Sequence, residues 1–192
     1  EAVLENLVKE IEEKGYRLST GDVGNRYLFQ TLADNGLNEV MYKMHNHREV
    51  PGYGFQLQFG ATTLTELWDP RAGASWNHFM MGQILEWFYK SLAGIRMDHE
   101  SINNESITND GHANNCQTVI IAPQVVGDLT YVSASHETVS GTISVDWRVE
   151  EGHFIMDLSV PFNCQAKVYL PGEENYELVQ SGTYSFRNEL FR

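Results

Sequence analysis

The chain has 192 residues, of which 42% are hydrophobic and 20% are charged, a composition typical of a folded globular protein. Its formal net charge is −13, because 26 acidic side chains stand against 13 lysines and arginines. Such a charge repels phosphates, which argues against nucleic acid and anionic membrane surfaces as partners and leaves neutral ligands open. No apolar run is long enough to span a membrane. Two cysteines, Cys116 and Cys164, are too few for a disulfide framework and leave the redox compartment undetermined.

The N-terminal half of the chain shows the apolar periodicity of helices. Helices are predicted over residues 1–14, 25–34, 37–47 and 77–94. Pro51 and the glycines around it predict a long irregular loop over residues 48–76. No capping residue precedes the first helix, so we expect the chain to be a piece cut from a longer protein.

The last of these helices carries an apolar stripe that we expect to face the core. Its members share helical spacing, and they are Met81, Ile84, Leu85, Phe88 and Leu92. Gly94 follows the stripe and predicts the end of the helix.

The C-terminal half changes to a period of two, which is typical of strands. Ile143, Val145 and Trp147 alternate with polar residues, and the same alternation recurs over residues 154–160, 166–170 and 182–186. Several short strands separated by turn residues predict an antiparallel β-sandwich. The fold class is therefore an α + β multidomain chain. The expected domains are residues 1–97 and 115–192, joined by a polar connector over residues 98–114.

Glu66 lies in the stretch "TTLTELWD" and supports two interpretations. Thr63 and Glu66 match the spacing of a capping box, in which the glutamate side chain reaches back to a backbone amide at a helix start. Alternatively, a carboxylate beside Trp68 in a partly apolar cleft suits general acid or base chemistry on a sugar, since aromatic rings are natural platforms for sugars. Spacing alone leaves both interpretations open.

His78 stands at the start of the last predicted helix and is also ambiguous. Ser75 or Asn77 can serve as the N-cap, which puts His78 in the first turn near the positive end of the helix dipole. A neutral imidazole there suits contact with a sugar hydroxyl, whereas the simpler interpretation is a histidine that caps its own helix. No metal is expected, because neither His45, His47 nor His78 shows the spacing of a metal site.

Long blocks of the sequence resemble a known family. They are "LSTGDVGNRYLFQTLADNGLNEVMYKM", "PGYGFQLQFGATTLTELWD", "SWNHFMMGQILEWFYKSLAGI", "IIAPQVVGDLTYVSA", "GTISVDW", "VPFNCQAKVYLP" and "SGTYSF". The first three resemble the end of the catalytic domain of bacterial α-L-rhamnosidases, glycoside hydrolase family 78. The others resemble the C-terminal β-sandwich of that family, in the same order.

The resemblance implies a fold and an activity. The helical part is expected to be the last hairpins of an (α/α)6 toroid, followed by an antiparallel β-sandwich. The reaction implied is inverting hydrolysis of terminal α-L-rhamnosyl groups from glycosides or polysaccharides, without a cofactor. The motif matched by "ATTLTELWD" holds the general base, which implies this role for Glu66. The motif matched by "NH" holds a histidine that contacts rhamnose, which implies that role for His78.

The resemblance also implies what lies outside the chain. The general acid of the family belongs to the part that precedes residue 1, so we expect the missing N-terminal part to be a partner and this chain alone to be inactive. A periplasmic or extracellular location is favoured over a cytoplasmic one. Two other functions stay open from the residues: a carbohydrate-binding or structural accessory module without catalysis, and a glycosidase of the same toroid acting on another sugar.

Overall fold

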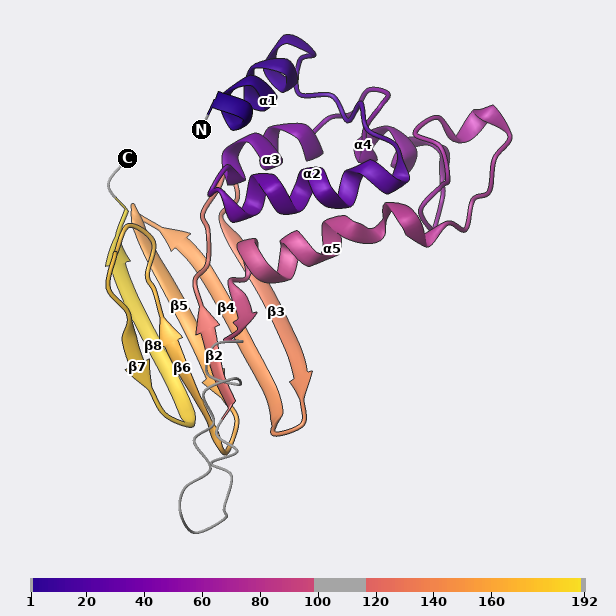
Figure 1. Ribbon diagram of the computed structural model, residues 1–192. Coiled ribbons are helices and arrows are strands. Elements are labelled where there is room, and N and C mark those ends of the chain that lie inside the picture. Colours follow the sequence, from indigo (N-terminus) through magenta and orange to yellow (C-terminus); the bar gives the residue numbers. More distant parts are fainter. Residues whose placement is uncertain (1, 99–116, 191–192) are drawn as a thin grey trace, which may run out of the picture. The chain divides into compact units, whose positions relative to one another are not determined.

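The computed structural model describes residues 2–98 and 117–190 (Figure 1). The chain divides between Trp87 and Phe88 into a helical unit before this point and a sheet unit after it. The connector predicted over residues 98–114 lies almost wholly outside the described residues, as does Cys116. The domain boundaries predicted from the sequence stay predictions.

The helical unit consists of helices joined by turns, as the apolar periodicity predicted. Its α-helices are α1 (Ala2–Glu13), α2 (Asp22–Asp34), α3 (Asn38–His45), α4 (Tyr53–Gln56) and α5 (Ile84–Trp87). Short 3₁₀ helices are η1 (Leu57–Phe59), η2 (Pro70–Ala72) and η3 (Phe79–Gln83). Helix α2 begins three residues earlier than predicted, because the amide of Asn25 already donates to the carbonyl of Gly21.

The core of the helical unit forms where α2 packs on α3, η3 and α5. Its buried apolar side chains include Leu18, Phe29, Leu32, Met41, Met44, Met81 and Trp87. The indole of Trp87 donates to Oδ1 of Asn38 at 2.8 Å, which satisfies two buried polar groups at once. This packing fixes α5 and the residues before it against the start of α2.

The apolar stripe predicted for residues 77–94 was partly wrong. Leu85 and Phe88 are exposed, whereas Trp87 is buried. The helical run is not a regular α-helix: it starts as 3₁₀ in η3, continues as α5, and ends as the π-helical η4 (Phe88–Leu92). A 3₁₀ turn holds about 3.0 residues and a π turn more than the about 3.6 of an α-helix, so residues at i and i+4 no longer share one face.

The sheet unit contains two four-stranded sheets (Figure 1). The first has the order β1 (Ile95–Met97), β2 (Gln117–Ile121), β6 (Cys164–Val168) and β7 (Glu177–Val179). The second has the order β3 (Tyr131–Thr138), β4 (Gly141–Glu150), β5 (His153–Val160) and β8 (Gly182–Glu189). Among the strand pairs that the structure describes, β2 with β6 is parallel and the others are antiparallel. A parallel pair needs a long crossover, which β3, β4 and β5 provide.

The two sheets enclose one apolar core. The strand alternation seen in the sequence is confirmed, since Ile143, Val145 and Trp147 are all buried. The indole of Trp147 donates to the carbonyl of Leu92 at 2.7 Å and thereby ties the end of η4 to the sandwich. Cys164 is buried in the same core as a free thiol.

Candidate active site

Glu66 and His78 lie on two irregular segments that run alongside each other. The amide of Glu66 donates to the carbonyl of Ser75 at 2.9 Å, and the amide of His78 donates to the carbonyl of Leu64 at 2.9 Å. These two backbone hydrogen bonds join residues that are nine and fourteen positions apart and so hold the two segments side by side. The pairing gives both side chains a fixed backbone despite their place in an irregular region.

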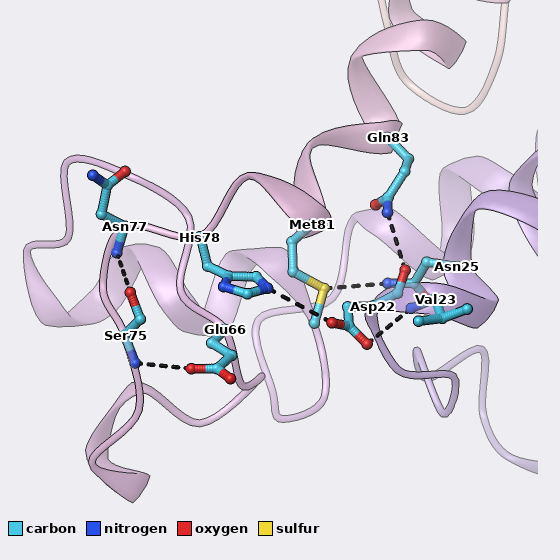
Figure 2. Close-up of polar contacts among 9 residues, drawn as sticks. All are labelled: Asp22, Val23, Asn25, Glu66, Ser75, Asn77, His78, Met81 and Gln83. Carbon is cyan, nitrogen blue, oxygen red and sulfur yellow. Dashed lines mark hydrogen bonds and ion pairs between the residues drawn. The ribbon is translucent and has the colours of Figure 1, made fainter.

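The carboxylate of Glu66 is held by a second contact to the same partner. The amide of Ser75 donates to Oε2 of Glu66 at 3.1 Å (Figure 2). No helix begins at residues 63–66, so the capping-box interpretation of Glu66 was wrong. In the part of the chain that the structure describes, no group donates a hydrogen bond to the other oxygen, Oε1. The half-buried carboxylate therefore has one anchored oxygen and one that can accept a proton or a hydrogen bond.

His78 occupies the position just before η3, one residue earlier than the first turn in which we predicted it. Its Nε2 faces Oδ2 of Asp22 at 3.6 Å (Figure 2). Nε2 is buried and has no hydrogen-bond partner in the described residues. The ring stacks on Phe79, with 6.2 Å between ring centroids. The backbone of His78 is thus fixed, while its imidazole has polar capacity that the described residues do not use.

The start of α2 is the element that positions His78. Gln83 donates from Nε2 to the backbone carbonyl of Asp22 at 3.0 Å, and Asn25 donates from Nδ2 to the sulfur of Met81 at 3.3 Å (Figure 2). Oδ1 of Asp22 accepts from the amide of Val23 at 2.8 Å. Sequence reasoning missed Asp22, which stands 56 positions before His78 and whose only local signal is its place at a helix start.

Trp68 is oriented by the same stretch of chain. Its indole Nε1 donates to the carbonyl of Thr20 at 3.0 Å. Its ring meets Tyr53 edge to face, with 5.0 Å between centroids and planes at 89°. Because Thr20 lies two residues before Asp22, the segment that anchors Trp68 also faces His78. The structure thus links Trp68 and His78 to the start of α2, and links Glu66 to Ser75, three residues before His78.

Beneath this region lies an aromatic stack centred on His45. The imidazole stacks against both Tyr53 and Trp87, at centroid distances of 5.5 and 5.4 Å, and Nδ1 lies 2.6 Å from the carbonyl of Met41. Burial lowers the pKa of His45 to about 4, so this histidine is neutral at physiological pH. Burial also raises the pKa of Tyr53, whose hydroxyl remains protonated and donates to the carbonyl of Met81 at 2.5 Å.

Within residues 2–98 and 117–190 no group of three or more His, Cys, Asp or Glu side chains is arranged to hold a metal ion. In the same residues no helix combines the length and the apolar character needed to cross a bilayer.

The chain matches two family models in succession. Residues 1–92 match the bacterial alpha-L-rhamnosidase 6 hairpin glycosidase domain, and residues 115–185 match the bacterial alpha-L-rhamnosidase C-terminal domain. The chain belongs to the bacterial α-L-rhamnosidase family. Both the predicted family and the predicted fold class are thereby confirmed.

Comparison with individual rhamnosidases shows what fraction of their length this chain covers. It is 33% identical over 181 residues to an α-L-rhamnosidase of Streptomyces avermitilis, covering 90% of this chain and 16% of that protein. It is 29% identical over 183 residues to an α-L-rhamnosidase of Formosa agariphila, covering 93% and 18%. The chain therefore spans less than a fifth of the length of these curated rhamnosidases.

Solved rhamnosidase structures resemble the chain along nearly its whole length. The α-L-rhamnosidase from Dictyoglumus thermophilum superposes with a TM-score of 0.79 at 30% identity, covering 97% of this chain and 23% of that one. The Streptomyces avermitilis enzyme complexed with L-rhamnose gives 0.77 at 27% identity, covering 96% and 19%. The native enzyme from Aspergillus terreus gives 0.82 at 26% identity, covering 95% and 21%.

Proposed function

We propose that this chain supplies the general base and part of the sugar-binding surface of an inverting α-L-rhamnosidase. Glu66 is the base, and His78 and Trp68 contact the sugar. The substrate is a rhamnose-containing glycoside or polysaccharide. The observation that carries the proposal is the reciprocal bonding of Glu66 and Ser75, which fixes a carboxylate on the segment that runs beside His78.

The chemistry follows from the two oxygens of Glu66. In an inverting glycosidase one carboxylic acid protonates the leaving oxygen while a carboxylate about 6.5–9.5 Å away activates a water on the opposite face of the sugar. The amide of Ser75 holds Oε2 by a charge-assisted hydrogen bond. Oε1 accepts the proton of the attacking water. The anchored geometry keeps the base in place between turnovers, so little reorganisation is needed at the moment of reaction.

The sugar contacts use groups that the fold leaves available. The buried Nε2 of His78 faces Asp22, so the Nδ1 edge of the ring is the one that meets a sugar hydroxyl. The N–H of Trp68 donates to the carbonyl of Thr20, which fixes the indole plane. The apolar face of the ring is then the part of Trp68 that contacts the sugar. A rigid aromatic and one oriented imidazole provide orientation at a small cost in side-chain entropy.

The general acid is assigned to polypeptide that precedes this chain. The domain matched by residues 1–92 is described as having six hairpins, and α1–α5 of the described residues supply fewer. The curated relatives are several times longer than the region they share with this chain. The proposal therefore concerns the complete enzyme, with this chain as its C-terminal part.

The deciding experiment replaces Glu66 by Gln in the complete enzyme and measures release of rhamnose from an aryl α-L-rhamnoside. Gln keeps the shape and still accepts from the amide of Ser75, but it cannot take a proton from water. We expect kcat to fall by about 10²–10⁴-fold, while L-rhamnose binding measured by calorimetry is retained. Glu49→Gln is the control, because Glu49 is an exposed carboxylate of the same irregular region that pairs with Arg17. Undiminished turnover by Glu66→Gln would remove Glu66 from the role of base.

The stereochemical course gives an independent test. Proton NMR of the first-formed product should show inverted configuration at the anomeric carbon, since a single displacement by water passes through no glycosyl-enzyme intermediate. Retained configuration would contradict the inverting mechanism. Aryl glycosides of other sugars, assayed in parallel, separate a rhamnosidase from a glycosidase of the same fold with another specificity.

A further inference from the structure

The strongest unassigned feature of the site is the carboxylate of Asp22. Its Oδ2 lies 3.6 Å from the buried Nε2 of His78, and that nitrogen has no hydrogen-bond partner in the described residues. We propose that Asp22 is a positioning residue that sets the tautomer and orientation of His78 for contact with the sugar. This inference rests on the proposed function of the site and adds a residue to it.

The electrostatics of the pair select one tautomer. A carboxylate repels the lone pair of an unprotonated ring nitrogen and attracts an N–H, so the side of the ring that faces Asp22 carries the proton. The neutral imidazole then has Nε2–H directed at Asp22 and a lone pair on Nδ1. Nδ1 becomes an acceptor for a sugar hydroxyl. Figure 2 shows that the Nδ1 edge of the ring is turned away from Asp22.

The backbone of Asp22 is fixed, while its carboxylate retains freedom. Gln83, five residues after His78, binds the carbonyl of Asp22 at 3.0 Å, so the two residues share one rigid frame. The Asp22 side chain is 38% exposed, which leaves its carboxylate room to move toward Nε2. Catalytic hydrogen bonds are often long in the unliganded state and shorten when substrate binds. The 3.6 Å contact is what an unliganded positioning pair is expected to show.

A purely structural role for Asp22 makes different predictions. As the first residue of α2, an acidic side chain stabilises the helix start whatever His78 does. Asp22→Asn separates the two roles, because the Asn carbonyl can still accept from the amide of Val23. Its NH₂ group then faces Nε2 and favours the opposite tautomer, with the proton on Nδ1. The hydrogen bond from Val23 is kept while the charge at the helix start is lost, and the hydrogen-bond polarity presented to the sugar is reversed.

The test is a double-mutant cycle in the complete enzyme, read by steady-state kinetics on an aryl α-L-rhamnoside and by calorimetry with L-rhamnose. We expect Asp22→Asn to weaken rhamnose binding and raise KM by about tenfold, with a smaller effect on kcat. In a His78→Ala background the same substitution should have little further effect, because Asp22 acts through His78. Asp22→Glu, which restores a carboxylate, should recover part of the affinity.

Glu5→Gln is the matched control, since Glu5 is an acidic residue in the first turn of α1 and does not contact a histidine in the described residues. It should change neither KM nor rhamnose affinity. Unchanged affinity in Asp22→Asn, or a loss that adds fully to that of His78→Ala, would overturn the inference while leaving the proposed function intact. A wild-type enzyme that neither binds nor releases rhamnose would overturn both.

Discussion

Glu66 and Ser75 bind each other twice: the amide of Glu66 donates to the carbonyl of Ser75 at 2.9 Å, and the amide of Ser75 donates to Oε2 of Glu66 at 3.1 Å. The second bond depends on the backbone of Ser75 and not on its side chain. The hydroxyl of Ser75 has a separate use, because it accepts from the amide of Asn77 at 3.2 Å. The position of the proposed base is therefore set by main-chain geometry.

A pair of substitutions at Ser75 tests this dependence. Ser75→Pro removes the donor to Oε2, and we expect kcat/KM on an aryl rhamnoside to fall by about 10²-fold in the complete enzyme, as misplacement of a catalytic group commonly does. Ser75→Ala keeps the amide and should retain activity. Circular dichroism and thermal midpoints of both variants report whether each is folded. Equal activities in two folded variants would show that the amide does not position Glu66.

His45 makes the stability of the helical unit depend on pH. Burial lowers its pKa from 6.5 to about 4, and its ring stacks against those of Tyr53 and Trp87. Between these pH values the unfolded chain binds a proton that the folded chain does not, so stability falls as pH falls from about 6.5 to about 4. Above that window the imidazole of His45 is neutral in both the folded and the unfolded chain, so it does not make the unfolding free energy depend on pH. The loss approaches about 3 kcal/mol at the acid end.

Denaturant titrations of the wild type and of His45→Phe between pH 4 and 7.5 isolate this contribution. Phenylalanine keeps the stacking but does not titrate, so the difference in unfolding free energy should shift in favour of the variant as pH falls. The carboxylates titrate in both proteins and cancel. Parallel pH dependences would show that His45 is solvated or protonated in the folded state.

The sequence predicted the elements of the fold well and their irregularities poorly. Apolar periodicity locates α1, α2 and α3, and strand alternation locates β4 and β5, because these patterns record which face is buried. The change from 3₁₀ to α to π helix along residues 79–92 has no corresponding pattern of apolar residues in the sequence. The capping-box interpretation of Glu66 failed because the spacing of Thr63 and Glu66 also occurs where no helix starts.

The sequence likewise indicates some residues of the candidate site and not others. Glu66, His78 and Trp68 could be singled out because their residue types and their resemblance to a family are local in the sequence. Asp22 could not, since its meaning comes from a contact across 56 positions. Ser75 was likewise considered only as a helix cap, because a backbone amide that holds a carboxylate has no side-chain signature.

Gly94 tests how the end of the helical run joins the sandwich. Its φ is +78°, and a Cβ placed there would lie 2.2 Å from the nitrogen of Pro123 and 2.4 Å from the carbonyl carbon of Ala122. We expect Gly94→Ala to destabilise the protein by at least about 3 kcal/mol, combining left-handed strain with a backbone clash. Gly152→Ala is the matched control, because Gly152 has a φ of +79° with no atom within 4 Å of its added Cβ. Gly152→Ala should lower the free energy of unfolding by about 1–2 kcal/mol. Equal losses of stability in the two variants, measured by thermal unfolding, would exclude a backbone clash at Gly94.

The exposed apolar side chains of the helical unit predict how the 192-residue chain behaves by itself. Val23 and Tyr27 lie on α2, and Phe79 and Leu85 lie on the neighbouring η3 and α5, all exposed. Under the proposed function this face is covered by the preceding part of the enzyme, so the chain alone should self-associate in light scattering and release no rhamnose from an aryl rhamnoside. Replacing Tyr27 and Phe79 by Gln should reduce the association, because these rings present the largest apolar surface to water. Val139→Ser should not, since Val139 is an exposed residue in the turn between β3 and β4. A monomeric chain would contradict the covered face. Measurable turnover by the chain would contradict the assignment of the general acid to the preceding polypeptide.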